Sequence, residues 1–446
     1  MKKCLTLIII LLCFSNMGFS QSKFVIQNNK QSDKVKFKLI NNLIIVPVEI
    51  NGITLSFIVD SGVSKPIIFN FLNVSDTLKI KNTETIFLRG LGEGEPVKAL
   101  KSTNNIFKMG DAINLNQDLY AVYDSNLNFA PRLGIPVHGI VGYDLFKDLV
   151  IEINYANKYL RLTQPEIFRY KKCKKCERFN LEFYNNKPYI NVEAEINKNT
   201  IPLKLLIDSG GSDALWLFED DSLGITCNNT FFNDFLGHGL SGSVYGKRSK
   251  IDVFSLKSFQ LKNANVAFPD SSSISFARNH KDRNGSLAGN ILKRFNIIFD
   301  YQKAIITIKA NHFFKEQFSY NKSGIELAHQ GLRLVQEVDN SILNKNRGGL
   351  ANNVSSNNNK IVIDTQYKLS LKPAYTIVEL REHSPAHKVG LLIGDIIISI
   401  NGRASHNFSL QQITEMFYQE AGKKIRLKVD RQGQLINKSF ILKSPL

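Results

Sequence analysis

The feature that most constrains the fold of this chain is a duplicated pattern in which an apolar run ends in Asp-Ser-Gly. The first copy reads Phe-Ile-Val-Asp-Ser-Gly-Val-Ser over residues 57–64, and the second reads Leu-Leu-Ile-Asp-Ser-Gly-Gly-Ser over residues 205–212. Their aspartates, Asp60 and Asp208, are 148 residues apart. A fold that relates the copies by symmetry would bring two carboxylates together, and paired carboxylates can share a proton and activate water.

The duplication extends beyond this motif. A glycine-rich stretch follows each copy, at residues 87–94 and 235–242, again with an offset of 148. Two apolar residues and a glycine come next in both copies, with Gly142 and Gly289 147 residues apart. A small drift in the offset is typical of duplicated domains whose loops have changed slightly. The sequence therefore predicts two homologous domains rather than two coincidental turns.

Each of these domains is predicted to be mainly β. Short β-branched runs at 43–50, 189–196 and 304–308 are typical of strands. Helices are expected only as short segments at 142–147 and 289–294, directly after the apolar pair and its glycine.

With these elements in this order, residues 36–310 resemble a retropepsin-like aspartic peptidase in which one chain contains both lobes. The resemblance rests on Asp-Ser-Gly-x-Ser after an apolar strand, a glycine-rich hairpin, and an apolar pair with glycine before a short helix, each found twice. It implies two β-barrel lobes related by a pseudo-twofold axis, at residues 21–168 and 179–315, joined by a basic linker at 169–178. It implies no cofactor and no metal.

The resemblance implies that Asp60 and Asp208 form a catalytic dyad that hydrolyses peptide bonds through an activated water. Two carboxylates in contact cannot both ionise cheaply, so the pair would share one proton, and which aspartate carries it is left open. The implied supporting residues of the two loops are Ser61, Gly62, Ser64, Ser209, Gly210 and Ser212.

The supporting residues have separate expected roles. The hydroxyls of Ser61 and Ser209 would lock the lobes together, and those of Ser64 and Ser212 would support the outer carboxylate oxygens. Glycines directly after the two locking serines would allow a tight turn that aims amide donors at the carboxylates. The glycine-rich hairpins would be flaps over the ligand, and the predicted flap residues are Gly90, Gly92, Gly94, Gly237, Gly239 and Gly242.

A third domain is predicted at residues 321–446. Ser-Pro-Ala-His-Lys-Val-Gly-Leu at 384–391, followed by Gly-Asp-Ile-Ile at 394–397 and Ile-Asn-Gly at 400–402, resembles a bacterial PDZ domain, a small α+β fold. Such domains bind an extended peptide or protein C-terminus as an added strand. The strand expected to bind it contains Tyr375, Thr376, Ile377 and Val378, with residues 370–374 as the carboxylate loop. An alternative is that this domain only packs against the lobes. Residues 340–360, rich in Asn, Gly and Ser, are interpreted as a flexible insertion.

The first twenty residues have the pattern of a secretory signal peptide. Two lysines precede an apolar run at 5–14, and small residues stand ahead of Gln21. We therefore expect a periplasmic or secreted protein with no transmembrane segment in the mature chain; retention by an uncleaved signal is the minor alternative. In an oxidising compartment, Cys173, Cys176 and Cys227 are expected to form one disulfide, whose pairing the sequence leaves open.

The net charge of +18 would favour binding to an anionic partner such as nucleic acid or a membrane surface. No nucleic-acid-binding motif accompanies it, and the lysines are spread along the chain, so nucleic acid is not expected as a partner. Two hypotheses follow. The first is an exported aspartic endopeptidase whose PDZ-like domain binds substrate or a partner; the second is a catalytically inactive periplasmic peptide-binding or adaptor protein that uses the same cleft and PDZ groove.

Overall fold

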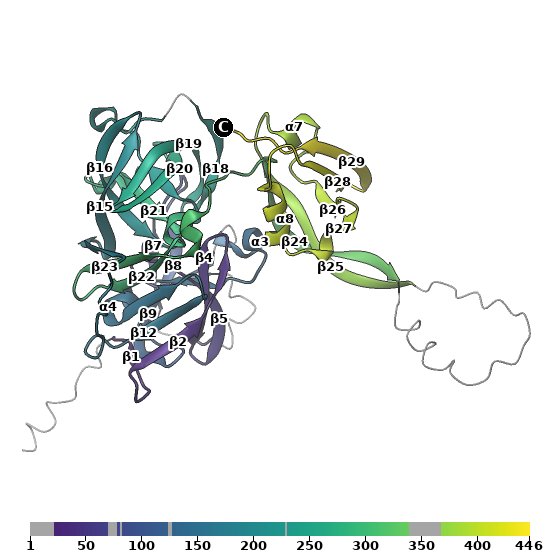
Figure 1. Ribbon diagram of the computed structural model, residues 1–446. Helices are drawn as coiled ribbons and strands as arrows, with labels where there is room; N and C mark the ends of the chain where they lie inside the picture. The colour runs from purple at the N-terminus through teal and green to yellow at the C-terminus, as the bar shows by residue number, and fades with distance from the viewer. Residues whose placement is uncertain (1–21, 70–77, 81–82, 124–126, 228–229, 339–366) are drawn as a thin grey trace, which may run out of the picture. The chain divides into compact units, whose positions relative to one another are not determined.

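The computed structural model describes residues 22–69, 78–80, 83–123, 127–227, 230–338 and 367–446. The predicted signal peptide at 1–20 and the predicted insertion at 340–360 lie outside these residues. The chain divides into two compact units, Met1–Tyr320 with Ser444–Leu446, and Asn321–Lys443. Figure 1 shows the strands that make up most of both units.

The first lobe of the first unit is a nine-stranded sheet with the order β1-β9-β6-β10-β5-β4-β8-β7, and β3 pairs with β4. Its strands are β1 (Val25–Ile26), β3 (Lys38–Ile40), β4 (Leu43–Ile50), β5 (Ile53–Val59), β6 (Ile67–Ile68), β7 (Thr83–Leu88), β8 (Val97–Met109), β9 (Ala112–Val122) and β10 (Gly139–Val141). Along β5, Leu55, Phe57 and Val59 are all buried, as expected of a strand that runs through the core.

The second lobe repeats this plan in an eight-stranded sheet with the order β14-β15-β16-β21-β17-β20-β19-β18. Its strands are β14 (Glu182–Tyr184), β15 (Lys187–Ile196), β16 (Asn199–Asp208), β17 (Leu215–Leu217), β18 (Phe232–Gly239), β19 (Gly242–Leu256), β20 (Phe259–Pro269) and β21 (Gly285–Ala288). β16 and β21 occupy the places that β5 and β10 hold in the first lobe, because each pair is parallel and each first strand leads into Asp-Ser-Gly.

The lobes are curved sheets rather than regular barrels, which corrects the barrel prediction. Each sheet returns on itself through one additional contact. In the first lobe this contact is between β8 and β9, while β8 meets its other neighbour β4 only at Glu49↔Lys108 and Ile50↔Phe107; in the second lobe β15 meets β19 over residues 193–195. A closed barrel needs a continuous register between all neighbouring strands, and these short pairings provide it at one place only.

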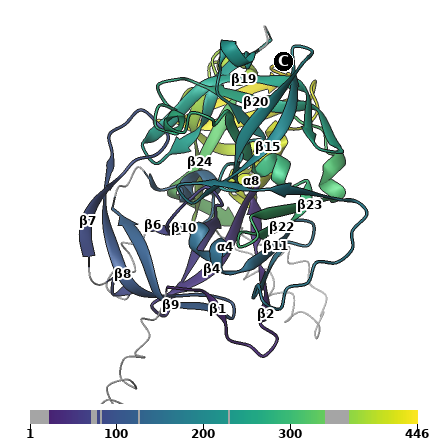
Figure 2. The same ribbon diagram turned by 90° about the vertical axis from the view of Figure 1, so that its left-hand side faces the viewer.

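A third sheet joins the lobes. Its order is β13-β23-β22-β11-β12-β2, so each lobe contributes three strands. They are β2 (Ser32–Lys36), β11 (Val150–Asn154), β12 (Tyr159–Thr163), β13 (Cys176–Asn180), β22 (Phe295–Asp300) and β23 (Ile305–Ala310). The central pair is β11 with β22, where Ile151 lies opposite Phe299 and Ile153 opposite Ile297. Figure 2 shows β11, β22 and β23 below the second lobe.

The helices of the first unit that lie within the described residues are short, as predicted. The α-helices are α3 (Ala130–Leu133), α4 (Tyr143–Asp148) and α5 (Gly289–Leu292), and the 3₁₀ helices are η3 (Asp221–Leu223), η4 (Ala277–Asn279) and η5 (His312–Lys315). α4 and α5 follow the paired strands β10 and β21. Within the predicted linker at 169–178, Cys173 and Cys176 form a disulfide, and residues from Cys176 onward belong to β13; Cys227 is free.

The second unit is a six-stranded sheet with the order β24-β25-β26-β28-β29, and β27 pairs with β26. Its elements are β24 (Ile325–Val338), β25 (Tyr367–Leu380), α7 (Pro385–Lys388), β26 (Ile396–Ile400), β27 (Arg403–Ala404), η6 (Ser405–Asn407), α8 (Leu410–Phe417), β28 (Lys424–Arg431) and β29 (Gln434–Ile441). Ser409 begins α8 with a capping box that includes Gln412, and Leu410, Ile413 and Phe417 of this helix enter the core of the unit. In the part of the chain that the structure describes, no helix has the length and apolar character needed to cross a bilayer.

Candidate active site

Asp60 and Asp208 both lie at the carboxyl end of a buried strand, where the chain leaves its sheet. Asp60 follows β5, and Asp208 is the last residue of β16. The amide of Asp60 donates to the carbonyl of Val141 at the end of the parallel neighbour β10. Gly142 is required next to it, because a Cβ there would lie 2.1 Å from the carbonyl oxygen of Asp60. The two neighbouring strands thus fix the backbone from which the carboxylate projects.

Ser61 and Ser209 join the two lobes below the aspartates. The Ser61 hydroxyl donates to the carbonyl of Ile207 at 2.7 Å and accepts from the amide of Ser209 at 3.1 Å. The Ser209 hydroxyl reciprocates, donating to the carbonyl of Val59 at 2.8 Å and accepting from the amide of Ser61 at 2.9 Å. Both serines are fully buried, so these four hydrogen bonds hold the aspartate-bearing loops in one fixed relation.

The carboxylates of Asp60 and Asp208 converge on Gly62 and Gly210. A Cβ placed on Gly62 would lie 3.1 Å from Oδ1 of Asp60 and 3.6 Å from Oδ1 of Asp208. A Cβ placed on Gly210 would lie 2.4 Å from Oδ2 of Asp60, in the other lobe. The two glycines also donate their amides, Gly62 to Asp60 at 2.6 Å and Gly210 to Asp208 at 3.1 Å. The structure therefore brings two carboxylates from separate lobes to one place.

This environment favours the protonated form of the pair. Burial, and after it the charge of Asp208, raises the pKa of Asp60 from 3.8 to about 7, against the opposing effects of the Gly62 amide and Lys187. Burial also raises the pKa of Asp208, opposed first by Arg283 and then by Lys187. Both aspartates keep some solvent-accessible surface, which a group that meets a ligand needs. The pair therefore retains a proton in the weakly acidic range.

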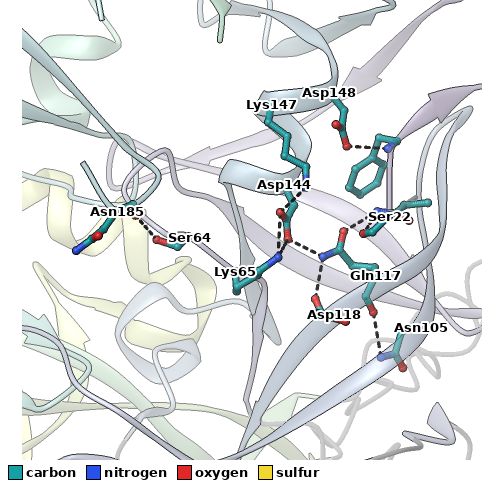
Figure 3. Close-up of polar contacts among 12 residues, drawn as sticks. Ser22, Ser64, Lys65, Asn105, Gln117, Asp118, Asp144, Lys147, Asp148 and Asn185 are labelled. Carbon is teal, nitrogen blue, oxygen red and sulfur yellow. Dashed lines mark hydrogen bonds and ion pairs between the residues drawn. The ribbon is translucent and has the colours of Figure 1, made fainter. Parts of the chain in front are cut away.

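Ser64 and Ser212 do not have the predicted contacts with the carboxylates. The Ser64 hydroxyl donates instead to the carbonyl of Asn185 in the second lobe at 2.8 Å (Figure 3). Ser212 is exposed, and its carbonyl accepts from the side chain of Asn42 in the first lobe at 2.8 Å. Each loop thus binds an Asn-Asn turn of the opposite lobe, at 41–42 or 185–186. The repeated Asn-Asn pair is the sequence signal for this contact.

A buried ion pair anchors the first loop on its far side. Lys65, directly after the motif, contacts Asp144 of α4 at 3.1 Å, and Lys147 contacts the same carboxylate at 3.0 Å (Figure 3). Gln117 of β9 donates a further hydrogen bond to it at 2.7 Å. Asp144 is almost fully buried, and these three donors satisfy its charge. The end of the loop is therefore tied to both α4 and β9.

The second loop has the opposite charge at the corresponding position. Asp213, five residues after Asp208 as Lys65 is after Asp60, pairs with Arg248 of β19 at 2.8 Å. Arg248 also pairs with Asp234 of β18 at 3.1 Å. The indole N–H of Trp216 donates to Asp213 at 2.7 Å. These anchors cannot be predicted from the sequence, because their partners are mostly distant along the chain and carry no motif.

The tips of the two glycine-rich hairpins contact each other. The amide of Gly94 donates to the carbonyl of Ser241, and the amide of Ser241 donates to the carbonyl of Leu91. Gly92 has a left-handed φ of 112°, and a Cβ on it would lie 2.5 Å from the backbone of Ser241. The hairpin tips are thus glycine-rich because their backbones touch.

The remaining predicted flap residues divide into two groups. Gly90 and Gly239 also lie close to the opposite tip, since a Cβ on either would come within 2.7 Å of it. Gly237 and Gly242 have open space around them, and their left-handed φ values of 153° and 119° account for the glycines there.

A cavity of about 880 Å³ lies beside these tips rather than at the aspartates. Its lining comes from residues 94–100, Tyr123, Leu127 and residues 238–243. Neither Asp60 nor Asp208 is among the lining residues. The geometry of the carboxylates, and not this cavity, therefore defines the candidate active site.

In the second unit, the structure corrects the strand chosen for peptide binding. Tyr375, Thr376, Ile377 and Val378 belong to β25, which lies between β24 and β26 and whose Tyr375 and Thr376 pair with both neighbours. A peptide cannot add to a strand whose two edges are already paired. Residues 370–374 are also part of β25 and form no carboxylate loop.

β24 and β29 are the end strands of this sheet as far as it is described, and α8 packs against β24. Ile325 and Leu327 of β24 share a core with the helix residues Ile413 and Phe417. Gly324, with a φ of 82°, turns the chain into β24. The signal in the sequence is Ser-Gly-Ile at 323–325, because it places a glycine immediately before a strand, which the segment at 370–374 lacks.

We predict that Ser61→Ala lowers the free energy of unfolding by about 2–4 kcal/mol, because it leaves the buried Ile207 carbonyl and Ser209 amide without partners. Urea unfolding measures this change. Ser212→Ala, at an exposed serine of the other motif, is the matched control and should stay within about 0.5 kcal/mol of wild type. Equal stability of Ser61→Ala and wild type would show that the serine contacts do not hold the lobes.

The comparisons with known proteins bear on the second unit. Residues 376–431, from within β25 to the end of β28, match the family described as PDZ domain. No match to the chain is found among curated proteins. The second unit thus contains a PDZ domain, a class of domain that binds peptides or proteins.

Proposed function

We propose that this protein is an exported aspartic endopeptidase, with two retropepsin-like lobes in one chain and a PDZ domain that binds a peptide or protein. The observation that supports the peptidase is the meeting of the Asp60 and Asp208 carboxylates at Gly62 and Gly210, with pKa values raised by burial. The reciprocal serine contacts support it further, because they hold the two carboxylates in a constant relation.

In the proposed reaction the pair carries one proton and one negative charge. The ionised carboxylate accepts a proton from a water molecule while the oxygen of that water attacks the peptide carbonyl carbon. The protonated carboxyl donates its proton to the carbonyl oxygen. The tetrahedral intermediate then breaks its C–N bond as the amine takes a proton from one carboxyl of the pair and a hydroxyl of the intermediate gives a proton to the other. One peptide and one water give a carboxylic acid and an amine, and the pair returns to its starting state with one proton.

For the PDZ domain, the proposed binding edge is β24. An extended peptide would pair with this strand and place side chains between it and α8, because end strands have unpaired N–H and C=O groups.

Export to the periplasm or beyond is part of the proposal. The signal-peptide pattern at residues 1–20 supports it. The disulfide between Cys173 and Cys176 also supports it, since disulfides persist in oxidising compartments.

The direct test is cleavage of a peptide library by the purified mature chain. We predict that Asp60→Asn and Asp208→Asn each lower kcat/KM by at least about a thousandfold, because one amide in the pair leaves no shared proton for both roles. Mass spectrometry of the products measures the rates. Asp221→Asn, at an exposed aspartate of the second lobe, is the control and should cleave as wild type does.

Two results would overturn the peptidase proposal. One is cleavage by either dyad variant at the wild-type rate. The other is no cleavage by a folded wild-type chain that nevertheless binds the peptides, which would support a peptide-binding adaptor instead.

The pH dependence of cleavage follows from the raised pKa of Asp60. Since that pKa is about 7, the pair loses its last proton as the pH rises through 7, and we predict that kcat/KM falls there. The acidic limit lies above the ordinary aspartate value, because the pKa of Asp208 is also raised. A profile from pH 3 to 9 checks this, and a rate that keeps rising above pH 8 would contradict it.

A further inference from the structure

The strand register of the second lobe puts a lysine opposite one aspartate of the pair. Tyr189 of β15 lies opposite Leu206 of β16. The pairing ends there, and the same register continued by two residues on each strand leads from Tyr189 to Lys187 and from Leu206 to Asp208. Residues opposite each other in an antiparallel pair point to the same face of the sheet. The side chain of Lys187 therefore lies on the face from which the Asp208 carboxylate projects.

The turn before Lys187 is docked on the first lobe. Asn185 and Asn186 have left-handed φ values of 48° and 62°, as in the tightest hairpin turns. The Asn185 carbonyl accepts from Ser64 of the first Asp-Ser-Gly-x-Ser loop. Phe183, on the other side of the turn, packs edge-on against Tyr301 at 4.8 Å between ring centroids. Lys187 is consequently held beside the loops of both lobes.

The charges around Lys187 are not balanced within the protein. The charged groups that act electrostatically on Lys187 are Asp60, Asp208 and Arg283. Among the described residues, no carboxylate forms an ion pair with it. A pair of aspartates that shares one proton carries a single negative charge, whereas protonated Lys187 and the buried Arg283 together carry two positive charges; burial, and after it the charge of Arg283, lowers the pKa of Lys187. A partly buried ammonium group without a close anion is stabilised by a ligand that supplies one.

The first lobe has an apolar residue at the corresponding position. Ile45 of β4 lies opposite Ile58 of β5, and the same register continued by two residues leads to Leu43 on β4 and to Asp60 after β5. Leu43 also follows a left-handed Asn-Asn turn, at residues 41–42, and it is buried. The two lobes therefore present different chemistry at equivalent places beside the pair.

We propose that Lys187 makes the cleft prefer an acidic side chain in the part of the substrate bound beside the second lobe, while Leu43 makes the equivalent position beside the first lobe prefer an apolar one. This inference rests on the proposed function and deepens it. It identifies the substrate class as peptides with Asp or Glu on one side of the scissile bond and an apolar residue on the other.

The experiment compares matched peptides that differ only by Glu or Gln at one position near the cleavage site, taken from library products. Wild type should cleave the Glu peptide about tenfold faster by kcat/KM, which corresponds to one favourable charge contact. Lys187→Leu should remove this preference, and Lys187→Glu should reverse it toward a Lys peptide. Leu43→Lys is the matched variant in the other lobe, and it should add an acidic preference on the opposite side of the scissile bond.

Binding of the same peptides to Asp60→Asn, measured by fluorescence anisotropy, separates the two proposals. Tighter binding of the Glu peptide than of the Gln peptide, together with an absence of cleavage by wild type, would support the Lys187 inference and overturn the peptidase. Equal binding and equal cleavage of the two peptides, or a preference unchanged in Lys187→Leu, would overturn the inference while leaving the peptidase intact. No binding of either peptide would overturn it as well.

Discussion

Four buried hydrogen bonds between the Ser61 and Ser209 loops hold together the part of the molecule on which the rest depends. Each hydroxyl donates to the strand that leads to the opposite aspartate and accepts from the opposite loop. Because the two lobes meet through these contacts and through β11 and β22 of the shared sheet, the carboxylates of Asp60 and Asp208 are fixed by backbone rather than by long side chains. Carboxylates so placed favour sharing a proton, since ionising both would leave two like charges close together in a buried site.

The duplication gives the two lobes a common fold, and the differences between the lobes make their surfaces beside the aspartate pair chemically different. The first loop is anchored by a lysine on a buried aspartate, and the second by an aspartate on an arginine. Beside the pair, Leu43 corresponds to Lys187. A symmetric pair of lobes would bind a peptide equally well in either direction. A charged side chain beside one lobe only would favour one direction of the bound peptide. The residues on the two sides of the scissile bond would then face chemically different side chains of the protein.

Much of this arrangement could be predicted from sequence because it is encoded locally. The strands at 43–50 and 189–196 follow from β-branched runs, and the short helices α4 and α5 follow from the glycines Gly142 and Gly289 at their starts. Contacts between distant residues could not be predicted in this way. The Ser64 hydroxyl was expected on a carboxylate, yet it bonds a turn of the other lobe, because the approach of that turn depends on the tertiary fold.

The PDZ domain shows the same limit. Its family was evident from Ser-Pro-Ala and Ile-Asn-Gly, and residues 376–431 match it. The binding strand was assigned wrongly, because whether a strand lies at the end of a sheet depends on its neighbours and not on its own residues. The prediction that each lobe is a β-barrel is wrong for a similar reason, because closure of a barrel depends on a few pairings between strands far apart in the chain.

Because the two lobes hold their carboxylates together, we expect Asp60 and Asp208 to titrate as one pair. Carbon-13 NMR of labelled aspartate carboxyl groups, followed from pH 2 to 9 in wild type and in Asp208→Asn, tests it most directly. We predict that the Asp60 carboxyl of wild type titrates near pH 7, and that its pKa falls once the neighbouring charge is removed, while burial keeps it above the ordinary value. Two carboxyls that titrate independently near pH 4, with Asp60 unchanged in the variant, would contradict it.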